Sequence, residues 1–237
     1  MKPFLAALLL LSLCARLAAA EDGGAAGPVD ADPIVATVSG IDIPASEFKL
    51  IMHRQMAFVI DHFQREDGPG YWADTGEPDT PIVLLREKSL NELKRIKTQL
   101  VWAAKLGIPA EPSFAKLKEQ LKKENERRAA AVPPQTIIYG PKQYGLKVFY
   151  ELQFSESAYQ LREKLAQEAN VSEEKIRQAF EARKSEFADL SFEQVRAALE
   201  KEIALGIADD RIREAVAAAT VQTNREAIAA VRPRSEP

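Results

Sequence analysis

Two histidines are the first side chains to consider for chemistry, because imidazole can act as a general base and as a metal ligand. His53 and His62 are the only histidines in the chain, and both fall in a segment whose apolar residues recur with a helical period. Their separation is about two and a half helical turns, so the two rings point to opposite faces. Zinc ligands on one helix need a spacing of three or four residues. We therefore interpret both histidines as polar surface or partly buried residues and predict no metal site.

Sequence motifs for other chemistry are missing. The chain has no Gly-x-Ser-x-Gly nucleophile elbow, no phosphate-binding loop and no dinucleotide fingerprint. Its many carboxylates fall on Glu- and Lys-rich helical stretches such as Glu119 to Glu126, and such faces are usually just solvated. We predict no catalytic residue, no cofactor and no enzymatic activity.

Aromatic side chains are unevenly distributed and suggest binding instead. Four of the five tyrosines fall between Tyr139 and Tyr159, and tyrosine suits a surface that is apolar yet tolerates water. Phe149 and Tyr150 are adjacent, so one helix is expected to show aromatic surface on two sides. An exposed patch of this kind is what an unfolded polypeptide would bind. The candidate binding residues are Tyr71, Trp72, Tyr139, Tyr144, Phe149, Tyr150 and Tyr159.

Each aromatic group also has a purely structural interpretation. The aromatic residues of the tyrosine-rich segment can fill a helical core, and for Phe154 we favour this interpretation. Tyr71 and Trp72 stand in a Gly- and Pro-rich loop, which its own aromatic side chains can hold against the body of the protein. The sequence leaves open which aromatic side chains face outward.

The first twenty residues differ from the rest of the chain. Lys2 gives a basic start, Phe4 to Leu13 is an apolar run, and Ala18 to Ala20 supplies small residues. This order is typical of a secretory signal peptide over residues 1–20, with cleavage expected after Ala20. The apolar run is shorter than the roughly 20 residues that span a bilayer. A lipoprotein anchored at Cys14 is the alternative, although the preceding leucine is not the small residue that such a signal requires.

Cleavage at this position bears on charge and compartment. It removes the only cysteine, so the mature chain is expected to form no disulfide. It also lowers the sum of Lys and Arg from 32 to 30 against 35 Asp and Glu, a net charge of −5. An acidic chain argues against a nucleic-acid partner, and no other apolar run is long enough for a membrane span. We expect a periplasmic or other extracytoplasmic protein.

The elements that must position the aromatic residues are mostly helical. After a flexible Gly-, Ala- and Asp-rich lead-in at residues 21–32, two short β-branched runs around Ser39 and Gly40 predict a hairpin. Helical periodicity follows, with Phe48, Met52, Met56, Val59 and Phe63 on one face. Further helices are expected at about 82–106, 112–131, 146–169, 172–187, 191–203 and 209–219, with loops at 65–81 and 133–145.

Capping residues and a terminal strand complete the prediction. Ser172 and Ser191 are helix caps, the second with Gln194 at the capping-box position. Residues 220–223 favour a short strand, and Asn224 caps a last turn. A two-stranded hairpin is marginal alone, so we expect it to pair with this strand. The predicted fold is mainly α, with both ends of the module at 33–237 in one composite lobe and residues 112–187 as a helical arm.

Five segments resemble one known family in order along the chain. VATVSGIDIPASEF resembles the "VATVNG-x-x-I-x-x-x-EF" opening of the SurA/PrsA-type extracytoplasmic chaperones, relatives of the chaperone module of trigger factor. The other four similar segments are LREKSLNELKRIKTQLVWAAKLGI, VSEEKIRQAFEARKSEF, SFEQVRAALEKEI and ATVQTNREAI. Together they cover most of the mature chain, so the resemblance implies the chaperone scaffold of that family.

The resemblance also shows what the chain lacks. In the family a parvulin prolyl-isomerase domain usually lies between the segment that ends here in KSEF and the returning SFEQV helix. Only Ala188, Asp189 and Leu190 stand there, whereas a folded domain needs at least about 50 residues. The resemblance therefore implies a chaperone that holds unfolded secreted or outer-membrane proteins. The missing nucleotide-binding motifs and the expected location predict that it works without ATP. The alternatives are a dedicated assembly factor for one envelope partner and, less favoured, an active prolyl isomerase. A homodimer stays open.

Overall fold

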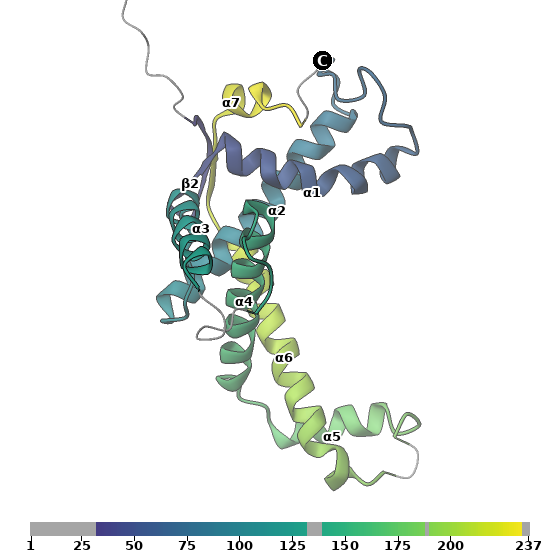
Figure 1. Cartoon of the computed structure of the whole chain (residues 1–237). Coiled ribbons are helices and arrows are strands. Elements are labelled where there is room, and N and C mark those ends of the chain that lie inside the picture. Colours follow the sequence, from purple (N-terminus) through teal and green to yellow (C-terminus); the bar gives the residue numbers. More distant parts are fainter. Residues whose placement is uncertain (1–31, 132–138, 188–189, 234–237) are drawn as a thin grey trace, which may run out of the picture. The chain divides into compact units, whose positions relative to one another are not determined.

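The computed structural model describes residues 32–131, 139–187 and 190–233. These residues form a mainly helical fold with one small antiparallel sheet, which confirms the predicted fold class (Figure 1). The elements are β1 (Ile34–Val38), β2 (Ile41–Pro44), α1 (Ala45–Phe63), α2 (Pro81–Lys105), α3 (Phe114–Ala129), α4 (Leu146–Gln167), α5 (Glu173–Ala182), α6 (Phe192–Ala218), β3 (Val221–Thr223) and α7 (Arg225–Ala230). The predicted signal peptide lies outside the described residues. None of the described helices is both long and apolar enough to cross a membrane.

The sheet joins the two ends of the described chain. Its strand order is β2-β1-β3, and Val38 of β1 pairs with Ile41 on one side and with Val221 on the other. Ser39 and Gly40 make the hairpin turn with positive φ angles of 50° and 81°, the region that two-residue hairpin turns require. The predicted pairing of the hairpin with the C-terminal strand is therefore confirmed.

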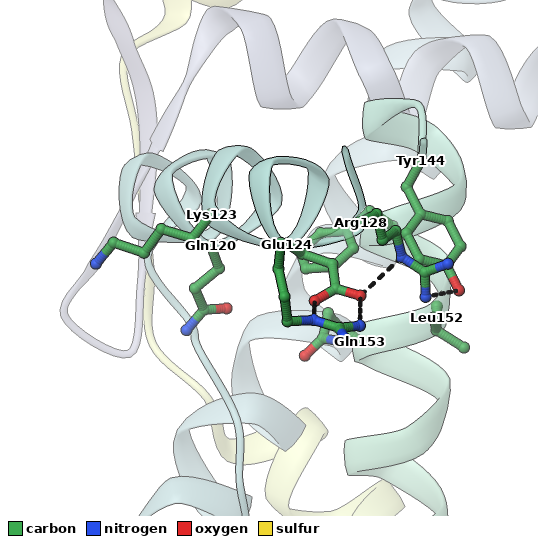
Figure 2. A pocket seen from close by; sticks show the side chains of 9 residues that line it. Gln120, Lys123, Glu124, Arg128, Tyr144, Leu152 and Gln153 are labelled. Carbon is green, nitrogen blue, oxygen red and sulfur yellow. Dashed lines mark hydrogen bonds and ion pairs between the residues drawn. The ribbon is translucent and has the colours of Figure 1, made fainter. Parts of the chain in front are cut away.

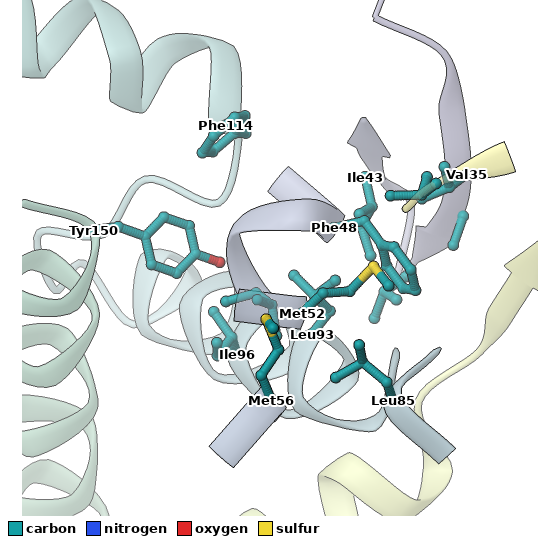
Figure 3. Packing of buried hydrophobic residues seen from close by; sticks show 14 of the residues in the cluster. Val35, Ile43, Phe48, Met52, Met56, Leu85, Leu93, Ile96, Phe114 and Tyr150 are labelled. Carbon is teal, nitrogen blue, oxygen red and sulfur yellow. The ribbon is translucent and has the colours of Figure 1, made fainter. Parts of the chain in front are cut away.

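The main core lies where α1 and α2 pack against the sheet (Figure 3). Phe48 and Met52, one turn apart on α1, are fully buried, as are Leu93 and Ile96 on α2. These residues recur at the three- and four-residue spacing of one helical face, so the apolar stripes that the sequence predicts are the packed faces. Figure 3 shows that Tyr150 also projects from α4 toward α1.

Helix α2 ends where Gly107 and Ile108 predict its C-terminus. Gly107 has a φ angle of 75°, and the backbone N–H of Ile108 donates to the carbonyl oxygen of Ala103 at 3.0 Å. Ile108 is buried behind the last turn. This left-handed termination with a hydrophobic contact is the expected one, and it turns the chain toward α3.

Two smaller apolar clusters follow along the chain. One joins Ala103 and Ile108 to Leu161, Leu165 and Ala208, between the second half of α4 and α6. The other has as its buried members Ile176 and Phe180 of α5 and Val195 and Leu199 of α6. The segment 112–187, predicted as a helical arm, therefore contributes to three clusters, because α3 and the first half of α4 belong to the main core.

The prediction of two separate helices at 191–203 and 209–219 is wrong. A single helix, α6, runs from Phe192 to Ala218. Gly206 lies inside it, and a Cβ added there would meet nothing within 4 Å. The buried residues Ala204 and Ala208 stand four apart, the spacing of one helical face, on either side of the glycine. One glycine in a long helix costs only about 1 kcal/mol relative to alanine, which packing on α4 and α5 offsets.

Candidate functional site: a groove between α3 and α4

Four of the seven candidate aromatic residues are buried, with exposed fractions between 2% and 8%. Tyr71 and Trp72 pack edge to face with ring centroids 4.7 Å apart, and both belong to the main core. The indole Nε1 of Trp72 donates to Asp67 Oδ1 at 2.8 Å. The structural alternative therefore holds for this pair, because the loop is held against the body by its own aromatic side chains.

The expectation that α4 shows aromatic surface on two sides is wrong. Phe149 is only 4% exposed and Tyr150 only 2%. The reason is that α4 has neighbours on both flanks. Phe149 faces the segment before α4, where its ring centroid lies 6.0 Å from that of Tyr144. Tyr150 faces the core, where its ring meets Phe114 of α3 edge to face.

Tyr150 is part of a buried polar cluster. Its hydroxyl donates to Glu47 Oε1 at 2.7 Å, and the Lys97 ammonium lies 2.6 Å from the same oxygen. Lys97 also donates to the carbonyl oxygen of Pro112 at 2.6 Å. Burial and the adjacent carboxylate raise the pKa of the Tyr150 hydroxyl well above its usual range. The cluster links α1, α2 and α4, so its role is to hold these helices together.

The exposed apolar residues of α4 form a stripe along one face. Val148 is 53% exposed, Leu152 42% and Tyr159 60%. Their spacings of four and seven residues place all three on one side of the helix. We call these three residues the α4 stripe. Only Tyr159 of the three is among the sequence candidates.

A groove of about 520 Å³ runs beside the first half of the α4 stripe (Figure 2). Figure 2 shows Gln120, Lys123 and Glu124 on the α3 side, while Leu152 and Gln153 come from α4. Buried Phe149 provides apolar floor. The lining residues are Gln120, Lys123, Glu124, Arg127, Arg128, Tyr144, Phe149, Leu152 and Gln153. Two of the seven sequence candidates, Tyr144 and Phe149, therefore meet in one groove.

The segment before α4 is held against α3 by two side chains. Asn125 makes a paired contact with the backbone of Tyr144: its Nδ2 donates to the carbonyl at 3.0 Å, and its Oδ1 accepts from the N–H at 2.8 Å. The buried guanidinium of Arg128 donates to the carbonyl oxygens of Tyr139 and Pro141 at 3.0 and 2.7 Å. These contacts fix the wall of the groove.

Tyr144 is held by its ring as well as by its backbone. The Arg128 guanidinium carbon lies 4.3 Å from the centroid of the Tyr144 ring, within cation–π range, and Nη2 donates to the Tyr144 hydroxyl at 3.1 Å. Gly140 leaves room for this arrangement, since a Cβ there would lie 3.3 Å from the same hydroxyl oxygen and its φ angle is 87°. The ring of Tyr144 is thus an ordered part of the groove.

Glu124 is the acidic group of the groove. Its carboxylate accepts two hydrogen bonds from Arg127, at 2.8 and 2.7 Å, and one from Arg128 Nε at 2.7 Å. The guanidinium of Arg127 is the main cause, with that of Arg128 next to it, of a Glu124 pKa lowered to about 2. The carboxylate is therefore charged at neutral pH and shared by two cations.

A second groove, of about 420 Å³, flanks the other end of the α4 stripe. Tyr159 lines it together with residues of α2 and α6. Its walls are tied by Arg162, which donates to both carboxylate oxygens of Asp209 at 2.6 and 2.8 Å. Arg95 also lines it and lies 4.9 Å from the centroid of the Phe154 ring. The α4 stripe therefore runs from one groove to the other.

The remaining sequence candidate is Tyr139. It is exposed, and its carbonyl binds Arg128 at the edge of the first groove. Sequence reasoning missed Leu152 and Val148 of the α4 stripe and the basic residues of α3. Glu124 and Arg128 have the four-residue spacing of a helical ion pair. That spacing, shortly before a tyrosine-rich loop, is the sequence feature that could have indicated these charged residues as part of the site.

Chemistry of another kind is not apparent at the groove. No group of three metal-binding side chains occurs in residues 32–131, 139–187 and 190–233. His53 contacts the carbonyl of Pro233, and His62 stacks on Phe58 of its own helix. The arrangement is that of a binding surface with an aromatic floor and a charged wall. No family model, no curated protein and no solved structure matches the chain.

Proposed function

We propose that this protein is an ATP-independent extracytoplasmic chaperone of the holdase type, which binds unfolded secreted or outer-membrane polypeptides without catalysis. The observation that carries the proposal is the α4 stripe, three large apolar side chains exposed on one helical face. Grooves adjoin the stripe at Leu152 and at Tyr159. The predicted signal peptide and the resemblance to SurA/PrsA-type chaperones support the compartment and the class of client.

Binding of this kind needs no reaction. Each client side chain that covers apolar surface contributes about 1–3 kcal/mol of binding free energy. A few such contacts therefore hold an unfolded segment and prevent its aggregation. The groove between α3 and α4 is open and lined by polar residues as well as apolar ones, which favours release without ATP. Buried Phe149 and clamped Tyr144 provide a fixed floor, so binding does not have to order these rings.

The test uses residues 21–237 and two unrelated proteins diluted from denaturant, with aggregation followed by light scattering. The wild type is expected to suppress aggregation of both clients near stoichiometric ratios. The double variant Leu152→Gln/Tyr159→Gln is expected to need at least about fivefold more protein, because two buried apolar contacts are lost. Both positions are exposed, so the fold should be retained.

Phe58→Gln is the matched control. Phe58 is a similarly exposed aromatic residue, on α1, and it lines neither groove. Equal loss in the control and the double variant would show that the α4 stripe is not the binding surface. No suppression of either client by the wild type would overturn the proposal and favour a factor dedicated to one envelope partner.

A further inference from the structure

Basic side chains gather on the α3 wall of the groove, in a chain that is acidic as a whole. Lys123, Arg127 and Arg128 line the groove against one carboxylate, that of Glu124, which leaves an excess of two positive charges. The whole chain carries a formal net charge of −3. The apolar floor therefore lies beside a local field of the opposite sign.

Two of these cations remain available to a ligand. Arg128 is committed to the protein, because its side chain is buried and its donors already bind Glu124, Tyr144 and backbone carbonyls. Arg127 binds Glu124 through Nε and Nη2, and its side chain is 57% exposed. A guanidinium has five N–H donors, so donors remain. Lys123 has no ion-pair partner within the part of the chain that the structure describes.

No acidic side chain other than that of Glu124 is among the residues that line the groove. Glu156 lies one turn beyond Leu152 on α4, but it does not line the groove. Its carboxylate accepts a hydrogen bond from Gln160 at 2.6 Å. Gln120 and Gln153 line the groove as neutral amides, which can donate to a carboxylate without opposing it.

We infer that this groove selects client segments in which an Asp or Glu side chain stands within two residues of a leucine or an aromatic residue. The apolar side chain covers Phe149 and Leu152, while the carboxylate meets Lys123 and Arg127. In an extended chain, residues two apart project to the same face about 7 Å from each other. The inference rests on the proposed function and gives it a substrate class.

The expected preference is moderate. Exposed ion pairs are individually weak, so two of them give a preference of about tenfold over a neutral segment, which corresponds to about 1.4 kcal/mol. The preference should shrink as salt is added, because screening acts on exposed charges. The apolar part of the binding should change little with salt.

The test uses three fluorescein-labelled, unstructured peptides with the same Leu and Phe positions. Their intervening residues are Glu in the first, Gln in the second and Lys in the third, and binding to residues 21–237 is followed by fluorescence anisotropy. We expect the Glu peptide to bind about tenfold more tightly than the Gln peptide, and the Lys peptide to bind most weakly.

Variants distinguish an effect of the groove cations on peptide binding from an effect of the overall charge of the protein. Lys123→Gln/Arg127→Gln is expected to reduce the Glu-over-Gln preference, the ratio of the two dissociation constants measured in the same variant, to within about twofold. Lys122→Gln is the matched control, a charge loss on the same helix at a highly exposed residue outside the groove. It is expected to keep the preference.

The outcomes distinguish this inference from the proposed function. If the Glu and Gln peptides bind equally well to the wild type, or if the control variant removes the preference as fully as the double variant does, the inference is wrong while the chaperone proposal stands. If no peptide binds and aggregation is not suppressed, the proposed function fails, and the inference fails with it.

Discussion

At the scale of single residues, this protein uses charge in two different ways. The pair Glu47 and Lys97 is buried, with 0% and 1% side-chain exposure and a separation of 2.6 Å. Glu124 and Arg127 are partly exposed to solvent at the edge of the groove, with the buried Arg128 behind them. A buried ion pair holds helices together, and removing one of its two partners strongly destabilises the fold. An exposed ion pair contributes little to stability, and its contribution depends on salt and pH.

Lys97→Met should destabilise the protein by about 3–5 kcal/mol, because it leaves the Glu47 carboxylate buried without its cation. Lys97→Met/Glu47→Leu removes both charges and should lie closer to the wild type than the single variant does. The measurement is urea unfolding at neutral pH, followed by circular dichroism. The single variant Glu47→Leu completes the set. If the losses of unfolding free energy in Lys97→Met and Glu47→Leu simply added in the double variant, the ion pair would not be coupled as described.

The pKa of Glu124 gives a pH prediction. It lies near 2, below the ordinary value of 4.5, so its ion pairs stabilise the folded state fully above about pH 4.5 and lose this effect as the pH falls toward 2. Solvent screening limits the contribution to about 1 kcal/mol. The difference in unfolding free energy between wild type and Glu124→Gln should therefore shrink between pH 5 and pH 3. A difference that stays constant over this range would contradict the ion pairs.

At the scale of elements, helix ends are well defined and helix interiors tolerate exceptions. Ser172 accepts a hydrogen bond from the Lys175 N–H, and the capping box of Ser191 and Gln194 is present. Asn224 accepts from the Ala227 N–H at 3.1 Å. These caps follow from side-chain chemistry that acts within four residues, so the sequence predicts them directly.

Gly206→Ala should stabilise the protein by about 0.5–1 kcal/mol, because it removes the entropic cost of glycine inside α6. The new methyl group would meet nothing within 4 Å. Gly107→Ala is the contrasting control: with a φ angle of 75° it should destabilise by about 1 kcal/mol. Thermal unfolding of both variants measures this, and a loss of stability in Gly206→Ala would contradict a continuous α6.

The attachment of the segment before α4 to α3 makes a separate prediction. Asn125→Ala removes both hydrogen bonds to the backbone of Tyr144. The amide hydrogen of Tyr144 should then exchange with solvent at least about tenfold faster, since its only described acceptor is lost. Hydrogen exchange followed by mass spectrometry of the peptide that contains this residue is the measurement. Unchanged exchange would show that the segment is held by other contacts.

At the scale of the whole molecule, the periodicity of apolar residues and the local composition predicted most of the fold. The stripe through Phe48 and Met52 and the hairpin at Ser39 and Gly40 are local patterns, and the structure has both. The pairing of β1 with β3 also followed, because a lone hairpin needs a third strand. The break assigned near Gly206 failed because one glycine does not outweigh packing on both sides.

The binding site was less accessible to sequence reasoning. Phe149 and Tyr150 were expected to be exposed, but a helix with neighbours on two flanks buries adjacent residues, and those neighbours are distant in sequence. Glu47 and Tyr150 are 103 residues apart, so no local pattern brings them together. Lys123 and Arg127 lie on a helix rich in Glu and Lys, where only the folded neighbours distinguish a groove wall from a solvated face.

The most direct measurement places a photo-crosslinking amino acid at Leu152, at Tyr159 and, as a control, at Phe58. Each variant of residues 21–237 is illuminated with a client freshly diluted from denaturant, and separately with the same client in its native state. The proposed holdase function predicts crosslinks from positions 152 and 159 to the unfolded client only, and few from position 58. Equal crosslinking from all three positions, or none from the α4 stripe, would contradict it.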